Sequence, residues 1–257
     1  MRWDDAEAHG VSVAVTTRLG GVSRPPYDTL NLGLHVGDRP EDVVANRARA
    51  ARAFGVGLDT IVFAHQVHGT NARMVGPAEA GRGATDQAEA VEDTDILVTT
   101  SPGVTLAILV ADCVPVALVD HEARVLAAVH AGWRGTGAGV AVAALHAMAD
   151  AGARPERVRV FLGPAVAPSR YQVGDEVRDA LANAMQPARL ESTVAQTDGP
   201  GRWRVDLVAA NRQQLEMAGV PAEHICESGI TTANPSLFSD RAQRPCGRFG
   251  LLARLIA

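Results

Sequence analysis

This chain contains no lysine, and all 24 of its basic side chains are arginine. Without lysine, the protein cannot form a Schiff base on a side-chain amine, and it cannot contain a phosphate-binding loop that depends on a lysine. Any anion that it binds must therefore be held by arginine, by backbone N–H groups or by a metal ion.

Cysteine, excess positive charge and long apolar segments are also scarce. Three widely spaced cysteines fit a reducing compartment and no disulfide framework. The net charge of −5, with both signs interspersed, gives no basic face for nucleic acid or a membrane. The acidic start MRWDDAEAHG lacks the apolar core of a signal peptide, and the apolar region VTLAILVADCVPVALV is interrupted by Asp and Pro. We therefore expect a cytoplasmic protein without a nucleic-acid or membrane partner; its oligomeric state stays open.

The distribution of apolar residues predicts one α+β domain over residues 1–257. With 47% apolar content the chain can bury a large core, and no repeat or linker divides it. Strand-like and helical patterns alternate irregularly, which predicts a mixed-sheet α/β sandwich and not a doubly wound sheet. Helices are expected at Pro40–Phe54, Val140–Ala149, Asp175–Met185 and Asp206–Ala218. Strands are expected at Val11–Thr16, Thr60–Val67, Asp95–Thr99, Val104–Val110, Pro115–Val119, Val125–Val129 and Val158–Leu162.

The segment FAHQVHGTN contains two histidines, His65 and His68, three residues apart. Strand-forming residues precede them and Gly69 supplies a turn, so we expect a strand up to Val67. An odd spacing in a strand directs side chains to opposite faces. The two histidines are therefore not expected to bind one ion together, and a partner for His68 must come from elsewhere.

A carboxylate stands within the apolar run LAILVADCVPVALVD, where two buried strands meet at Asp112 and Cys113. Burying a carboxylate costs several kcal/mol unless it is paired or solvated. Cys113 alone would be interpreted as a small buried apolar residue. With Asp112 beside it, the pair indicates a site at the mouth of the sheet.

The segment VLAAVHAGWRGTGAGVAVAAL predicts a strand that ends at His130, a glycine-rich loop that carries Arg134, and a buried helix. Backbone N–H groups at such a helix start can bind an anion, which predicts a phosphate cradle between Gly132 and Gly139. The glycines could equally form only a tight turn, because no complete nucleotide-binding motif is present.

His68, Cys113 and His130 each follow or end a strand, so their side chains could converge on one rim. Two imidazoles and a thiolate suit zinc with an open fourth position, and they also suit copper. The spacings of 45 and 17 residues match no local zinc signature. The spacing alone therefore does not decide between a metal site and separate side chains.

A resemblance to the laccase-domain (YfiH-like) family bears on this choice. FAHQVHGTN, VADCVPV and VHAGWRG, with NLGLHVGD and GPAVAPSRYQVGDEV, resemble that family's motifs from about Thr16 to Arg248. The resemblance implies an α/β sandwich and a metal held by His68, Cys113 and His130, with no requirement for a histidine at position 65.

The same resemblance implies an enzyme, a purine nucleoside phosphorylase with zinc-dependent adenosine deaminase activity. Its expected partners are phosphate and a nucleoside: adenosine, inosine and, as a further candidate, methylthioadenosine. We expect Asp112, Cys113 and Arg134 to be catalytic, with Asp112 as a proton donor in deamination. Contacts to substrate or phosphate are expected from the following side chains: Arg18, Arg47, Gln66, Arg134 and Arg248.

Alternative functions follow from the same residues. A single copper ion in the His68, Cys113 and His130 site would fit a polyphenol oxidase, although the chain lacks the His-x-His pairs of a multicopper relay. A metal-free hydrolase would use Cys113 as nucleophile and His130 as base, in line with the family's link to peptidoglycan editing. Trp133 could stack on a base or cover the core. At the C-terminal end, LFSDRAQRPCGRFG departs from the family pattern at Asp240 and Ala242, whereas Arg241 fits it.

Overall fold

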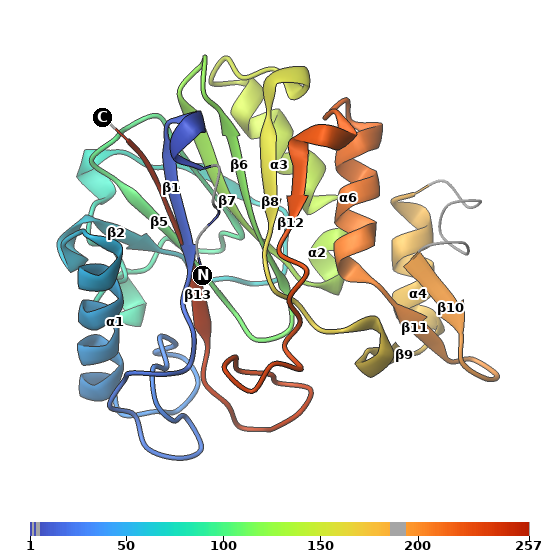
Figure 1. Ribbon diagram of the computed structural model, residues 1–257, viewed down its shortest axis with the longest axis horizontal. Helices are drawn as coiled ribbons and strands as arrows, with labels where there is room; N and C mark the ends of the chain where they lie inside the picture. The colour runs from blue at the N-terminus through green and yellow to red at the C-terminus, as the bar shows by residue number, and fades with distance from the viewer. Residues whose placement is uncertain (2, 4–5, 186–193, 257) are drawn as a thin grey trace.

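Two mixed β-sheets pack face to face, with helices on both outer surfaces (Figure 1). The computed structural model describes residues 1, 3, 6–185 and 194–256. The first sheet has the order β1 (Val11–Val15), β13 (Phe249–Leu255), β5 (Thr105–Val110) and β2 (Ile61–Phe63). The second has the order β12 (Ile225–Glu227), β8 (Arg159–Leu162), β6 (Val114–Asp120), β7 (Val125–Ala131), β4 (Ile96–Thr99) and β3 (Ala72–Met74).

Three helices cover the two sheets. α1 (Pro40–Phe54) lies on the first sheet, while α3 (Val140–Ala149) and α6 (Leu207–Met217) lie on the second. The short α2 (Trp133–Gly137) precedes α3. A small third sheet of β10 (Ala195–Thr197), β11 (Trp203–Val205) and β9 (Gln172–Val173) packs with α4 (Asp175–Asn183) at one end of the molecule.

The apolar run in β5 shows why the sandwich forms. Leu106 and Ile108 belong to the core between the two sheets, whereas Ala107 and Leu109 belong to the core between the first sheet and α1. Successive side chains of a strand point to opposite faces, so a strand covered on both faces has to be apolar throughout. Every residue of β5 is buried, and its sequence TLAILV has no solvent face.

The first covering helix begins and ends where the sequence indicates. Pro40 occupies its first turn, and Gly55, in the left-handed conformation with φ of 84°, ends it. Ala50, Ala51 and Phe54 are buried against the first sheet. In the part of the chain that the structure describes, no helix is both long and apolar enough to cross a membrane.

The predicted fold class, a mixed-sheet α/β sandwich, is confirmed. The predicted bounds of α1 and α3 are also correct, and the bounds of most strands are correct within one or two residues. Two expectations are wrong: β2 ends at Phe63 and not at Val67, and residues 133–137 form α2 in place of a loop. Six strands were not predicted: β3, β9, β10, β11, β12 and β13. β13 was missed because its sequence, FGLLARL, contains a glycine and an arginine and does not alternate clearly.

Candidate metal centre and cavity

His130 is positioned by the pairing of β4 with β7. In this antiparallel pair Ile96 lies opposite Val129, so Asp95 lies beside His130, and the His130 N–H donates to the Asp95 carbonyl at 2.9 Å. The two side chains also meet: His130 Nδ1 lies 2.7 Å from Asp95 Oδ1, and both residues are buried. A carboxylate on Nδ1 keeps the proton there and leaves Nε2 free to act as a ligand.

Cys113 lies in the turn between β5 and β6. Asp112, with φ of 93°, adopts a left-handed backbone conformation that residues other than glycine rarely take. The strain is compensated by its carboxylate, which accepts hydrogen bonds from Ser239 Oγ at 2.8 Å and from the Arg241 N–H at 2.6 Å, as well as from Thr232 Oγ1. Asp112 thus ties the turn of Cys113 to the C-terminal segment. Three donors thus occupy its two oxygens, and the expected role of Asp112 as a proton donor in deamination stays a prediction.

His68 lies on a loop that the same Asp95 organises. Asp95 Oδ2 accepts from Gly69 N at 2.7 Å and Val67 N at 3.2 Å, while Oδ1 accepts from His68 N at 3.0 Å. His68 itself has a φ of 63°, so this is a tight turn and not a strand. The prediction of a strand up to Val67 is therefore wrong, because the chain leaves the sheet before His65 and His68.

The structure nevertheless brings the three predicted ligands together. The ligand atoms of His68, Cys113 and His130 all lie within 4.8 Å of one another, and the two imidazole rings meet edge to face at 4.6 Å. Among the described residues this is the one such group found. His65 is not a member of it; its Nδ1 lies 3.9 Å from Asp93 Oδ1 instead.

The chemistry of this group fits a bound metal ion. A Cβ added to Gly132 would lie 2.7 Å from His68 Cδ2 and 3.0 Å from Cys113 Sγ, so only glycine leaves room for the two ligands. Two imidazoles and a thiolate form a set typical of zinc, and three protein ligands leave one position of a tetrahedral site open.

The charges at the group support a thiolate ligand. Burial opposes ionisation of Cys113, but the imidazoles of His130 and His68 outweigh it and lower the pKa of the thiol to about 6. Burial likewise opposes a charge on His130, but Cys113 and Asp95 outweigh it and raise the pKa of this histidine. Asp95, despite its burial, has a lowered pKa because His130 and the backbone N–H groups stabilise its anion. Asp95 therefore stays negative beside the ligands.

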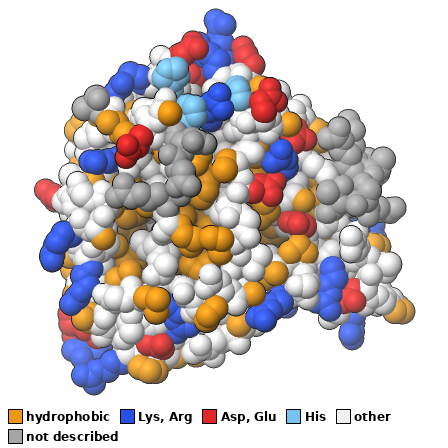
Figure 2. Space-filling model, in the orientation of Figure 1, with side chains coloured by type: hydrophobic (Ala, Val, Ile, Leu, Met, Phe, Trp, Pro, Cys, Tyr) orange, Lys and Arg blue, Asp and Glu red, His pale blue; other side chains and the backbone are white. Residues whose placement is uncertain are grey.

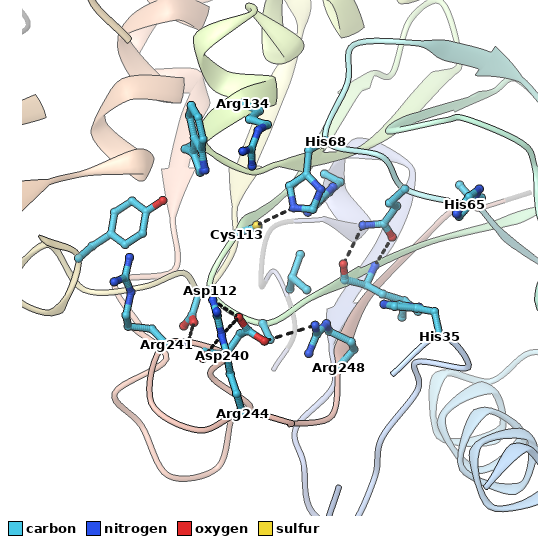
Figure 3. Close-up of a pocket in the computed structure, with 18 of the residues that line it drawn as sticks. His35, His65, His68, Asp112, Cys113, Arg134, Asp240, Arg241, Arg244 and Arg248 are labelled. Atoms are coloured by element: carbon cyan, nitrogen blue, oxygen red, sulfur yellow. Dashed lines mark hydrogen bonds and ion pairs between the residues drawn. The ribbon is translucent and has the colours of Figure 1, made fainter. Parts of the chain in front are cut away.

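A cavity of about 450 Å³ opens over the metal-ligand group (Figure 3). Trp133, Arg134 and Tyr171 line it from one set of elements, and the C-terminal segment contributes another wall. Arg134 lies over the Trp133 ring at 4.2 Å. Burial raises the pKa of the Tyr171 hydroxyl to about 12, so this phenol keeps its proton at neutral pH and can donate a hydrogen bond. The volume is that of an ordinary small-molecule site.

The segment from Gly132 to Gly139, where an anion cradle is predicted, is helical in part and not a loop throughout, and the cradle itself stays a prediction. Residues 133–137 fold into α2, and the N–H groups of Thr136, Ala138 and Gly139 are hydrogen-bonded to carbonyls within the segment. Trp133 lines the cavity and also packs against the core, so it meets both interpretations that the sequence left open.

Two of the predicted arginine contacts lie elsewhere. Arg47 is 1% exposed on α1, where its guanidinium donates to carbonyls of residues 32, 83 and 84 and covers the Phe63 ring. Arg18 pairs with Asp28 at 3.0 Å and lies over Phe238. Neither arginine lines the cavity, because each is occupied in joining loops to the core.

The other predicted contacts do line the cavity. Gln66 uses both ends of its amide on the backbone of Leu109, at 2.8 Å each, and so holds the loop of His68 against β5. Arg134 and Arg248 reach the cavity from different elements. Asp95 was not predicted from the sequence, where its only signal was a carboxylate at the start of an apolar strand. No role was predicted for Tyr171 or Arg244, which also line the cavity.

Comparisons with known proteins show the family of this chain. Residues 12–256 match the family described as multi-copper polyphenol oxidoreductase laccase, and the chain belongs to that family. A purine nucleoside phosphorylase of Mycobacterium tuberculosis strain H37Rv is 43% identical over 239 residues, which cover 92% of this chain and 89% of the relative. The purine nucleoside phosphorylase YlmD of Geobacillus stearothermophilus is 39% identical over 252 residues, 96% of this chain and 89% of that protein.

Solved structures show the same fold. The crystal structure of YlmD from Geobacillus stearothermophilus superposes with a TM-score of 0.92 at 38% identity, covering 96% of this chain and 93% of that one. The crystal structure of the Bacillus licheniformis hypothetical protein YfiH gives a TM-score of 0.91 at 35% identity, covering 95% and 92%.

Proposed function

We propose that this chain is a purine nucleoside phosphorylase that also deaminates adenosine, with a zinc ion held by His68, Cys113 and His130. The observation that carries the proposal is the combination, in one cavity, of a three-ligand group with an aromatic side and several arginines. Relatives that match more than nine tenths of this chain are named purine nucleoside phosphorylases, which supports a nucleoside substrate.

The metal would be held by the two imidazoles and the thiolate, with Asp95 fixing the proton of His130 on Nδ1. When bound, zinc supplies a Lewis acid that polarises an oxygen atom or activates water. Copper suits the same three ligands. Since the described residues contain one such ligand group, a relay of several copper ions lacks the ligands it would need.

The residues of the chain itself would bind and orient the substrate. Trp133 offers an aromatic surface for a purine, and the Tyr171 hydroxyl offers a proton-bearing donor at the wall. Phosphorolysis needs a phosphate held beside a sugar that becomes cationic, and Arg134 and Arg248 are the predicted arginines that reach the cavity.

Product analysis tests this function. The purified enzyme should convert inosine to hypoxanthine and ribose 1-phosphate only when phosphate is present, and adenosine to adenine and inosine, as followed by mass spectrometry. Arg134→Ala should lower phosphorolysis by roughly two or more decades while deamination suffers less, because a charge-assisted contact that strengthens in the transition state is lost. Free ribose in place of ribose 1-phosphate would make the protein a hydrolase.

One observation favours a second candidate. The site has the arrangement of a catalytic triad, with Cys113 as the nucleophile, His130 as the base and Asp95 as the carboxylate that orients the base. His130 Nδ1 lies 2.7 Å from Asp95 Oδ1. A metal-free cysteine hydrolase would use this order. Chelation discriminates the two functions, because removal of zinc should abolish nucleoside turnover but should free the thiol of a hydrolase.

A further inference from the structure

The C-terminal wall of the cavity holds one acid between two arginines. Asp240, Arg244 and Arg248 line the main cavity of about 450 Å³, and they also line an adjoining hollow of about 380 Å³. Figure 3 shows Arg244 and Arg248 both reaching Asp240 beside the metal-ligand group. These three side chains, the Asp240 cluster, therefore separate two hollows that are each large enough for a small anion.

The contacts of Asp240 resemble those of a bound oxyanion. Asp240 Oδ2 lies 2.7 Å from both Nε and Nη2 of Arg244, and Oδ1 lies 3.5 Å from Nη2 of Arg248. Two guanidinium groups that converge on one pair of oxygens match the geometry with which arginine binds carboxylate or phosphate.

The two arginines differ in how firmly they are held. Arg248 Nη1 donates to the carbonyls of Cys246 at 3.0 Å and Gly247 at 3.1 Å, so its guanidinium is fixed with Nη2 directed to Asp240. Arg244 is 75% exposed, and in the described part of the chain the hydrogen bonds found for its side chain all go to Asp240. Arg244 can therefore move with an incoming anion while Arg248 stays in place.

The cluster has a fixed position relative to the metal ligands. Asp112, next to Cys113, accepts the N–H of Arg241 at 2.6 Å and the hydroxyl of Ser239 at 2.8 Å, one residue on each side of Asp240. Burial and then the charge of Arg248 lower the pKa of the neighbouring His35 to about 4, so this histidine adds no charge at neutral pH. The positive charge of the wall is carried by the arginines.

We propose that Arg244 and Arg248 form the phosphate subsite of the cavity, and that Asp240 is an internal counter-anion that phosphate displaces. The inference rests on the proposed phosphorylase function and assigns its anion to this wall. With Asp240 in place, the three groups carry a net charge of one positive unit; without it they carry two. Asp240 thus lowers the affinity for phosphate and raises the phosphate concentration that the enzyme needs for turnover.

The test replaces Asp240 with its neutral isostere. Asp240→Asn should lower the KM for phosphate in inosine phosphorolysis roughly five- to tenfold, because a like charge next to the bound anion is removed. Arg244→Gln should raise that KM. Binding of phosphate without turnover, measured by calorimetry, should change in the same directions. Asp198→Asn is a matched control that should leave both readouts unchanged. Asp198 also pairs with an arginine at 2.7 Å and is 32% exposed, against 29% for Asp240, but it lies between β10 and β11 of the small third sheet and does not line the cavity.

Each other outcome overturns the inference. An unchanged KM for phosphate in Asp240→Asn would mean that the bound anion lies out of reach of Asp240, on another wall of the cavity. A raised KM for phosphate would mean that Asp240 holds the arginines in place. A raised KM for inosine alone would mean that Asp240 contacts the ribose. If the wild-type enzyme releases no ribose 1-phosphate, the phosphorylase function fails, and calorimetry still decides whether the arginines bind phosphate.

Discussion

Replacing Asp95 with asparagine should weaken metal binding as well as destabilise the fold. The two oxygens of Asp95 accept four hydrogen bonds, from His130 Nδ1 and from the N–H groups of Val67, His68 and Gly69. Asparagine has one oxygen, so two of these donors lose their acceptor whichever way the amide turns. Each buried donor left unsatisfied costs about 1–3 kcal/mol, so two of them predict a loss of about 2–6 kcal/mol in the free energy of unfolding.

The effect on the metal is separate from this cost. If the amide nitrogen faces His130 Nδ1, the ring proton moves to Nε2, the atom that faces Cys113, and the histidine can no longer act as a ligand. If the amide oxygen faces His130, the turn that carries His68 loses two of its anchors. Outer partners of metal ligands are typically worth 10–100-fold in affinity, so we expect zinc affinity to fall by about that factor.

The assay compares zinc affinity and stability in parallel. Zinc affinity is measured by competition with a chromophoric chelator, and stability by urea unfolding of the metal-free proteins. Asp120→Asn is the matched control, because Asp120 is also a buried carboxylate with several donors, including the Arg157 guanidinium at 2.7 Å. Asp120 is the last residue of β6, whereas Cys113 precedes the first, so the two lie at opposite ends of the strand. Wild-type zinc affinity in Asp95→Asn would refute the reasoning, and an equal loss in both variants would attribute the effect to general destabilisation.

Three further predictions concern the surroundings of the metal ligands and the pH dependence of stability. Gly132→Ala should lose most of the bound zinc, measured by plasma mass spectrometry, because its Cβ would lie 2.7 Å from His68 Cδ2 and 3.0 Å from Cys113 Sγ; full occupancy would show that the turn can shift. His65→Ala should keep its zinc, whereas Cys113→Ser should lose it, and the opposite result would place the wrong histidine in the site. Asp120 has a folded-state pKa below 3.8, since hydrogen bonds and an arginine outweigh its burial. Its contribution to stability is therefore complete at neutral pH and is lost as the pH falls, so the difference in urea midpoint between wild type and Asp120→Asn should be constant above about pH 5 and shrink below it. A difference that grows in acid would contradict this sign.

Local sequence patterns determined many of the elements, and the family resemblance of three motifs supplied the candidate metal ligands. Pro40 and Gly55 mark the ends of α1 because proline and glycine act on the backbone wherever they stand. The unbroken apolar run of β5 indicated a strand covered on both faces. Thiolates and imidazoles suit zinc, but only the resemblance of the motifs around His68, Cys113 and His130 to those of a known family implied that these three are the metal ligands.

Tertiary structure alone decided which charged side chains serve the site. Asp95 reaches His130 across 35 residues because β4 and β7 are neighbours, and no local pattern encodes that pairing. Arg47 and Arg248 look alike in the sequence, yet one lies under Phe63 in the core and the other lines the cavity. A charged side chain can contact a substrate only if the packing of the surrounding segments directs it into the cavity. That packing depends on contacts between residues that are far apart in the chain, so the local sequence does not reveal it.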